Sequence, residues 1–177
     1  MRYLSICFIL SLIVTNSSTL FAQNLPEWLM PSRDGRDFYV QGKMHLSADS
    51  SITEGEVEVK RFAEDTLLFK FRTDGGLFEF FLHKDMNYLV TFKHKFTDHK
   101  PILFDTHGPE EKAWRKGFAL LLDIYMERLP DNFSRSLLNE PFGKVVYNDK
   151  TRLFEPDQEY SSNQMFRWDI EKQRVSQ

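Results

Sequence analysis

Between residues 38 and 106 the chain repeats one pattern, in which short runs of alternating apolar and polar residues are separated by turn-forming residues. The segment FKFRTDGGLFEFFLHKDMNYLVTFKHKF, residues 69–96, shows it most clearly. Alternation places successive side chains on opposite faces of a strand, so each run has one apolar face. Asp74-Gly75-Gly76 is typical of a tight hairpin, because glycine accepts the positive φ that such turns need. The pattern predicts about six short strands, as in an antiparallel sandwich.

The 17 phenylalanines of the chain favour two packed layers over one open sheet. A single sheet that exposed this many aromatic rings would aggregate, whereas two sheets placed face to face would bury them. We therefore expect an all-β fold, a Greek-key antiparallel β-sandwich of prealbumin or Ig type, with its core in residues 38–106. Gly42 is expected to mark a bulge in the first strand.

Residues 107–177 are interpreted as a C-terminal extension that packs on the sandwich. The run FALLLDIYM, residues 118–126, is apolar on both sides and predicts a strand buried on both faces, although a helix is an alternative. A short helical turn is expected over residues 134–138, and a short strand over 142–148. Residues 160–173 show weak helical periodicity.

The first 22 residues have the features of a secretory signal peptide. Arg2 precedes an apolar run, and Ala22 suits the position before a cleavage site. A membrane anchor is the alternative, but the run is shorter than the roughly 20 residues of a bilayer span. We expect an exported protein of the periplasm or outer envelope, with no transmembrane span after cleavage and an extended lead-in over 23–37. The single cysteine, Cys7, lies inside the leader, so no disulfide is expected in the mature chain.

Sequence motifs give no support to catalysis, to a cofactor or to nucleic-acid binding. The 23 basic and 26 acidic residues are mixed along the chain, without a basic stripe. No phosphate-binding loop or GxSxG elbow is present. The histidines lack the i, i+2 or i, i+4 spacing of metal ligands, so no metal site is expected; they are His45, His83, His94, His99 and His107. Asp74 and Asp105 are interpreted as turn residues, with calcium binding as the alternative.

Four aromatic residues lie outside the regular strand faces and form the candidate interaction rim, namely Trp28, Tyr39, Trp114 and Trp168. Such residues can form a platform for a protein or a sugar. They can also simply cover the edges of a sheet.

Residues from about 50 to 106 resemble a known domain family. The matching segments are GEVEVKRF, FKFRTDGGLFEFFL, YLVTFKHKF and KPILFDT. They are similar to the carboxypeptidase regulatory-like, transthyretin-like domain of exported proteins from Bacteroidetes-type bacteria. The segments LNEPFGKVVYN and LFEPDQEY resemble an extension found in small envelope proteins of those bacteria. The resemblance implies a Greek-key sandwich that serves as a structural or interaction module without catalytic residues of its own.

Three functions follow as hypotheses. The first is a non-enzymatic cell-envelope module that binds another envelope protein or an envelope polymer through sheet edges or the aromatic rim. The second is a periplasmic carrier or binding protein for a small apolar ligand or a glycan. The third is a hydrolase with a cryptic site, which no group of residues in the sequence supports.

Overall fold

The computed structural model describes residues 36–46, 52, 54–95, 97, 99–130 and 132–175. The predicted signal peptide and nearly all of the predicted lead-in therefore lie outside the described residues. The elements are β1 (Asp37–Leu46), β2 (Glu54–Arg61), β3 (Thr66–Asp74), β4 (Leu77–His83), β5 (Asn87–Lys93), β6 (Lys100–Asp105), α2 (Glu111–Trp114), β7 (Phe118–Met126), α3 (Arg135–Asn139), β8 (Gly143–Asn148), β9 (Leu153–Pro156) and α4 (Gln158–Val175).

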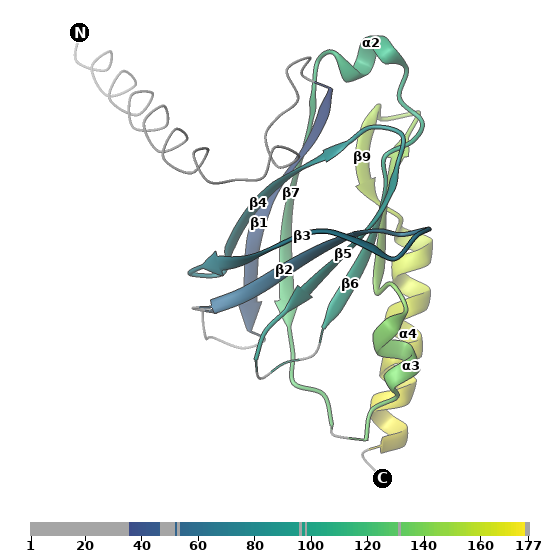
Figure 1. Ribbon diagram of the computed structural model, residues 1–177. Coiled ribbons are helices and arrows are strands. Elements are labelled where there is room, and N and C mark those ends of the chain that lie inside the picture. Colours follow the sequence, from purple (N-terminus) through teal and green to yellow (C-terminus); the bar gives the residue numbers. More distant parts are fainter. Residues whose placement is uncertain are drawn as a thin grey trace, which may run out of the picture.

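The nine strands form a single sheet with the order β7-β1-β4-β3-β2-β5-β6-β8-β9. The sheet curls into a barrel-like shape, and α4 runs along one side of it (Figure 1). The pairing between adjacent strands is shortest between β3 and β4, where Asp74 and Leu77 are the single pair of residues in register. Gly75 and Gly76 join these strands with φ values of 59° and 77°, which confirms the predicted hairpin turn.

The β-rich class and the C-terminal helix are confirmed, but the strand arrangement differs from a purely antiparallel one. β1 pairs with β7 in parallel, and β6 pairs with β8 in parallel. Parallel neighbours need a crossover. Along the chain, β2 to β6 lie between β1 and β7, and α2, β7 and α3 lie between β6 and β8. The short strand β9 pairs with β8 in the antiparallel direction.

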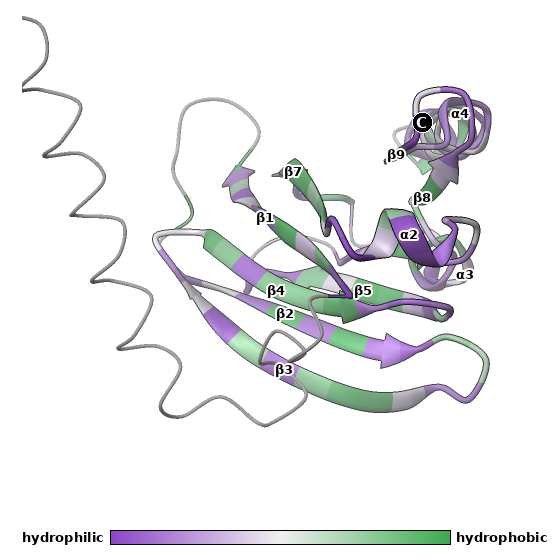
Figure 2. Cartoon of the chain, turned by 90° about the horizontal axis from the view of Figure 1, so that it is seen from above, coloured by the Kyte–Doolittle hydropathy of each residue, from purple (hydrophilic) through white to green (hydrophobic). Residues whose placement is uncertain are grey.

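Aromatic rings from opposite parts of the curled sheet fill its interior. Phe78 of β4 lies 4.9 Å from Phe92 of β5, measured between ring centroids. Phe38 of β1 stacks on Phe154 of β9 at 4.4 Å. Apolar and polar residues alternate along the strands, so one face of each is hydrophobic (Figure 2). The phenylalanine content therefore serves a shared core, as the composition predicts.

β7 is a strand, and the helical alternative is wrong, but its predicted burial on both faces is also wrong. Ala119, Leu121, Asp123 and Tyr125 are exposed, while the residues between them face inward. The reason is that β7 ends the sheet and its outer face is exposed within the described part of the chain. Gly42 is not a bulge either, because β1 keeps its register through it. A register shift does occur between β2 and β3, where Val59 pairs with Phe69 and Lys60 pairs with Leu67, so the extra residue lies on β3.

A second, smaller core holds α3 and α4 beside the sheet. It consists of Leu129, Phe133, Leu137 and Trp168, with Leu138 and Phe142 against it. Asp157 caps α4, since its carboxylate accepts a hydrogen bond from the backbone N–H of Tyr160 at 3.0 Å. Both predicted helical segments are therefore present. The small core holds α4 against the side of the sheet.

Candidate functional site

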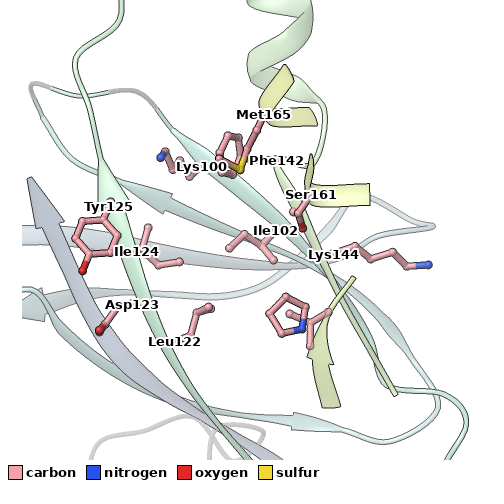
Figure 3. Close-up of a pocket in the computed structure, with 13 residues that line it drawn as sticks. Lys100, Ile102, Leu122, Asp123, Ile124, Tyr125, Phe142, Lys144, Ser161 and Met165 are labelled. Atoms are coloured by element: carbon pink, nitrogen blue, oxygen red, sulfur yellow. The ribbon is translucent and has the colours of Figure 1, made fainter. Parts of the chain in front are cut away.

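A gap between β7 and β8 contains an apolar cavity of about 310 Å³, which we call the seam cavity. β7 forms one wall, β6 and β8 form the other, and the first half of α4 borders it (Figure 3). The side chains that define its apolar character are Ile102, Leu122, Ile124, Phe142, Val145 and Met165. With Pro156 of β9, the lining combines residues from five strands or helices and one loop that are far apart in sequence.

The alternation of β7 decides which of its side chains reach the seam cavity. Leu122 and Ile124 point toward β6 and β8, whereas Asp123 and Tyr125 point to the other side of the strand (Figure 3). The cavity exists because β7 has a hydrogen-bonded neighbour, β1, on one side only within the described part of the chain. The other edge strand, β9, pairs only with residues 145–148 of β8, so the inward side chains at the end of β7 border an opening beside the start of β8.

Aromatic residues close the seam at the start of β7. Phe118 of β7 lies edge-on to Phe154 of β9, with ring centroids 5.0 Å apart. Trp114 packs against both rings, at 4.9 Å from Phe118 and 5.7 Å from Phe154. The cavity therefore occupies the remaining length of the seam, toward the end of β7.

Lys100 marks the opposite end of the seam cavity. It is only 8% exposed, and its ammonium lies 4.5 Å from the centre of the Phe142 ring, within the range of a cation–π contact. Its Nζ is 3.9 Å from Oε1 of Glu127, and Oε2 of Glu127 is 2.8 Å from Nζ of Lys172. The cavity thus joins an apolar body to a charged end, which is the arrangement of many sites for amphipathic ligands.

The outer face of β7 carries a separate set of side chains. Tyr125 stacks on His45 of β1 at 4.9 Å, and His45 Nε2 lies 3.5 Å from Asp123 Oδ1. Leu121, in the same row, is 72% exposed. The side chains of this face point away from the seam cavity, on the opposite side of β7.

A second, wider cavity of about 610 Å³ lies where β3 and β4 separate after their hairpin. Phe71, Phe78 and Phe80 contribute to its floor, but charged residues of both signs surround them. These include Lys43, Arg72, Asp74 and Glu79. Because Glu79 also accepts a hydrogen bond from the hydroxyl of Tyr39 at 2.6 Å, part of this rim is already paired within the protein. The seam cavity is the more apolar of the two.

The structure does not bring the predicted aromatic rim together. Trp114 and Trp168 are each 1% exposed, so neither is available to a partner. Trp114 closes the seam, and Trp168 packs on Phe133 and Phe142 in the small core. Tyr39 is partly exposed on β1, and Trp28 lies outside the described residues. An exposed platform is therefore wrong for Trp114 and Trp168. Trp114 on α2 packs inward against β7 and β9, and Trp168 on α4 packs into the small core.

Three of the histidines, His45, His83 and His107, lie in different parts of the molecule, each beside one acidic residue. His83 Nδ1 lies 3.0 Å from Asp37 Oδ1, and His107 Nδ1 lies 2.7 Å from Asp105 Oδ1. Asp105 also accepts a hydrogen bond from the backbone N–H of His107, which is a turn-capping role. Across the described residues, no three His, Cys, Asp or Glu side chains gather in a way that could hold a metal ion.

Sequence reasoning missed the residues that form the seam cavity. The alternation of residues 118–126 places Leu122 and Ile124 on the opposite face of the strand from Asp123, so the sequence could have predicted the apolar wall that β7 forms. Lys100, Phe142 and Met165 had none, because they meet through strand pairings and helix packing that local patterns do not encode.

Comparison with known protein families finds no family model that matches the chain, and comparison with functionally characterised proteins finds no significant match. The resemblance to the carboxypeptidase regulatory-like domain therefore stays a prediction. Among the described residues, none of the helices is long and apolar enough to cross a bilayer.

Proposed function

We propose that the chain is a non-enzymatic protein of the cell envelope whose seam cavity binds a small apolar ligand. The single observation that supports this proposal is the cavity itself, about 310 Å³ in volume and bordered by aliphatic and aromatic side chains of β6, β7, β8 and α4. Sites for small molecules are commonly concave, mostly apolar and of this order of size. The side chains that point into the space, such as Ile102 and Ile124, suit binding through apolar contact.

Export to the periplasm or outer envelope belongs to the same proposal. It rests on residues 1–22, where a basic residue, an apolar run and Ala22 follow one another as in a signal peptide. The likeness of residues 50–106 to the transthyretin-like domain of exported bacterial proteins points the same way. We include the Greek-key, prealbumin-type relationship in the proposal on the same grounds.

The test measures binding of a neutral fluorescent apolar dye, Nile red, to the purified mature protein. Leu122→Trp fills the cavity from β7, and Leu121→Trp adds the same ring to the outer face of the same strand. We expect wild type and Leu121→Trp to bind the dye equally, and Leu122→Trp to bind it at least about ten-fold more weakly. Circular dichroism and thermal unfolding establish that both variants are folded.

Two outcomes contradict the proposal. One is the absence of saturable dye binding by the wild-type protein, which needs no variant to interpret. The other is equal binding by Leu122→Trp and Leu121→Trp, because the dye would then bind elsewhere.

A second function, binding of an envelope protein or polymer, is favoured by β7, which among the described strands is hydrogen-bonded on one edge only, to β1. This strand has nine residues, and an edge strand of this length can pair with an extended segment of another chain. Cross-linking in the native envelope tests it with Leu121→Lys, next to the edge, and Leu77→Lys, an exposed control at the β3–β4 hairpin. A partner captured by wild type and Leu77→Lys but lost with Leu121→Lys supports this function, and equal capture by all three proteins contradicts it.

A further inference from the structure

The edge of β4 that faces β3 is almost unpaired. On its other edge β4 pairs with β1 at seven register positions, from Leu77 to His83. With β3 it shares only the pair of Asp74 and Leu77 at the hairpin. From Phe78 to Leu82, therefore, no described strand pairs with this edge of β4. The backbone N–H and C=O groups along an edge of this kind can pair with another extended chain.

The wider cavity of about 610 Å³ borders this unpaired edge. Residues 77–81 of β4 all line it, although successive side chains of a strand point to opposite faces. A cavity that touches five consecutive residues therefore borders the edge of the strand as well as its faces. Phe71 and Arg72 of β3 line the cavity from across the gap, and Figure 1 shows the two strands separating after their hairpin.

Both strands that border the gap are held by contacts on their far sides. β3 pairs with β2 along its length, and Oγ1 of Thr73 accepts the backbone N–H of Gly55 at 2.8 Å. The hairpin tip is fixed to β1, because the carbonyl of Gly76 accepts the backbone N–H of Met44 at 2.9 Å. An incoming strand would not have to order either of its neighbours, which lowers the cost of binding.

The outward side chains of β4 form a row in the order apolar, acidic, apolar, and they are Leu77, Glu79 and Phe81. The hydroxyl of Tyr39 donates to Oε2 of Glu79, while Oε1 accepts no hydrogen bond from the described residues. The carboxylate can therefore accept a further bond from a basic side chain. The order of the row is the same in both directions, so the side chains that suit it do not depend on the direction of an added strand.

The charges around the cavity also favour a basic ligand. Asp74, Glu79 and Asp123 are acidic. Lys43 and Arg72 are basic, so three acidic and two basic side chains leave the lining with a net charge of −1. Oppositely charged residues that face each other on neighbouring strands stabilise the pairing, and like charges weaken it. A residue opposite Glu79 should therefore be Lys or Arg.

We propose that the unpaired edge of β4 binds an extended segment of a partner protein as an added strand, with the order apolar, basic, apolar along its outward face. The basic side chain lies opposite Glu79, and the two apolar side chains lie beside Leu77 and Phe81. Backbone hydrogen bonds supply affinity, and the alternate side chains supply selectivity. This site is separate from the seam cavity and from the edge of β7, because β4 and β7 lie on opposite sides of β1.

The probe is a synthetic heptapeptide with blocked ends, Ser-Leu-Thr-Lys-Thr-Leu-Ser, whose outward row as a strand is Leu, Lys, Leu. Isothermal titration calorimetry at low ionic strength compares this Lys peptide with a Glu peptide, in which Glu replaces the Lys. We expect the mature protein to bind the Lys peptide at least about five-fold more tightly, because the Glu peptide places like charges opposite each other. Amide hydrogen exchange locates the peptide, since residues 78–82 should gain protection at the alternate amides that are directed to the unpaired edge.

Two charge reversals assign the preference to a residue. Glu79→Lys should reverse it, so that the Glu peptide binds more tightly than the Lys peptide. Asp123→Lys makes the same reversal in the outward row of β7, between Leu121 and Tyr125, and should keep the preference for the Lys peptide. Circular dichroism and thermal unfolding establish that both variants are folded.

Several results would overturn the inference. Two concern the wild-type protein alone, namely equal affinity for the two peptides, or no saturable binding of the Lys peptide. A third is peptide binding without added protection in residues 78–82. The fourth is a preference that survives in a folded Glu79→Lys protein or reverses with Asp123→Lys, which would place the peptide on another strand. If Glu79→Lys does not fold, hydrogen exchange of the wild-type protein decides. Each of these results leaves the ligand-binding function of the seam cavity standing.

Discussion

Gly42 of β1 lies directly against the backbone of Leu122 in β7. A Cβ atom at position 42 would come within 1.7 Å of the Leu122 carbonyl oxygen and 2.8 Å of the ring of Phe78. β1 pairs in parallel with β7 on one side and antiparallel with β4 on the other. Gly42 is the register partner of Leu122 in β7 and of Phe78 in β4. The absence of a side chain here allows β7 to join the sheet, and β7 forms one wall of the seam cavity.

We expect Gly42→Ala to destabilise the protein and to weaken binding in the seam cavity. The added methyl group must displace backbone, and overpacking of this kind costs about 1–3 kcal/mol or more. Denaturant unfolding measures the loss of stability, and Nile red titration measures the loss of binding. Gly143→Ala is the matched control for the stability measurement, because its Cβ would meet Ser161 Oγ at an ordinary 3.6 Å. A Gly42→Ala protein as stable as Gly143→Ala would contradict the close approach of β1 and β7.

The predictable parts of this fold are those that local patterns determine. The turn at Gly75 and Gly76 follows from glycine chemistry, and β2 to β5 follow from alternation. Alternation identifies the faces of a strand but not its neighbours, so the parallel pairing of β1 with β7 could not be predicted. β9 has four residues, too few for a periodic signal.

The candidate site was less predictable because its parts meet only in three dimensions. Trp114 is buried because Phe118 and Phe154 lie beside it, and those two rings come from β7 and β9. The contact between Lys100 and Phe142 likewise depends on the parallel pairing of β6 with β8. Nothing in the composition around either residue indicates which distant segment will cover it.

Trp168 offers a test of the small core between α3 and α4. Its indole Nε1 is buried and has no hydrogen-bond partner within the described residues, so the ring contributes through apolar contact. We expect Trp168→Ala to lower the free energy of unfolding by about 3–5 kcal/mol and to loosen α4. Trp168→Phe should cost much less, because it keeps an aromatic ring and removes an uncompensated N–H. Denaturant unfolding of both variants measures the difference, and equal losses would show that the indole nitrogen is satisfied.

The buried hydroxyl of Tyr88 is expected to lower the free energy of unfolding at alkaline pH. Burial raises the pKa of Tyr88 to about 12, and its hydroxyl accepts the backbone N–H of His83 at 3.1 Å. A raised pKa in the folded state contributes stability that is complete below the ordinary value of 10.0 and is lost as the pH rises through 12. We expect Tyr88→Phe to be about 1–2 kcal/mol less stable at pH 7, because the N–H of His83 loses its acceptor.

Unfolding of wild type and Tyr88→Phe across this alkaline range checks the prediction. The stability of the variant should fall less steeply, so the two curves converge. Tyr125→Phe, which changes an exposed tyrosine, should follow wild type throughout. Parallel curves for wild type and Tyr88→Phe would mean that this hydroxyl does not carry the alkaline transition.

The cross-strand ion pair between Glu58 of β2 and Lys93 of β5 is expected to make stability fall as the pH becomes acidic. Burial alone would raise the pKa of Glu58, but the hydrogen bond from Lys93 and the charges of Lys93 and Lys60 outweigh it, so the pKa lies below its ordinary value of 4.5. The Nζ of Lys93 lies 2.6 Å from Oε2 of Glu58. A lowered pKa in the folded state contributes stability above the ordinary value, and this is lost as the pH falls through the folded-state pKa.

We therefore expect Glu58→Gln to be about 1 kcal/mol less stable than wild type at pH 7 and equally stable once the pH falls below the lowered pKa of Glu58. The difference shrinks because protonation removes the charge that the substitution has already removed. Glu56→Gln, two residues earlier on β2, is the control, since no ion pair of Glu56 is present in the described part of the chain. Urea unfolding of the three proteins between pH 7 and about pH 2 measures the effect. A difference between wild type and Glu58→Gln that persists unchanged at the acid limit would show that packing, and not the ion pair, holds β2 to β5 at this position.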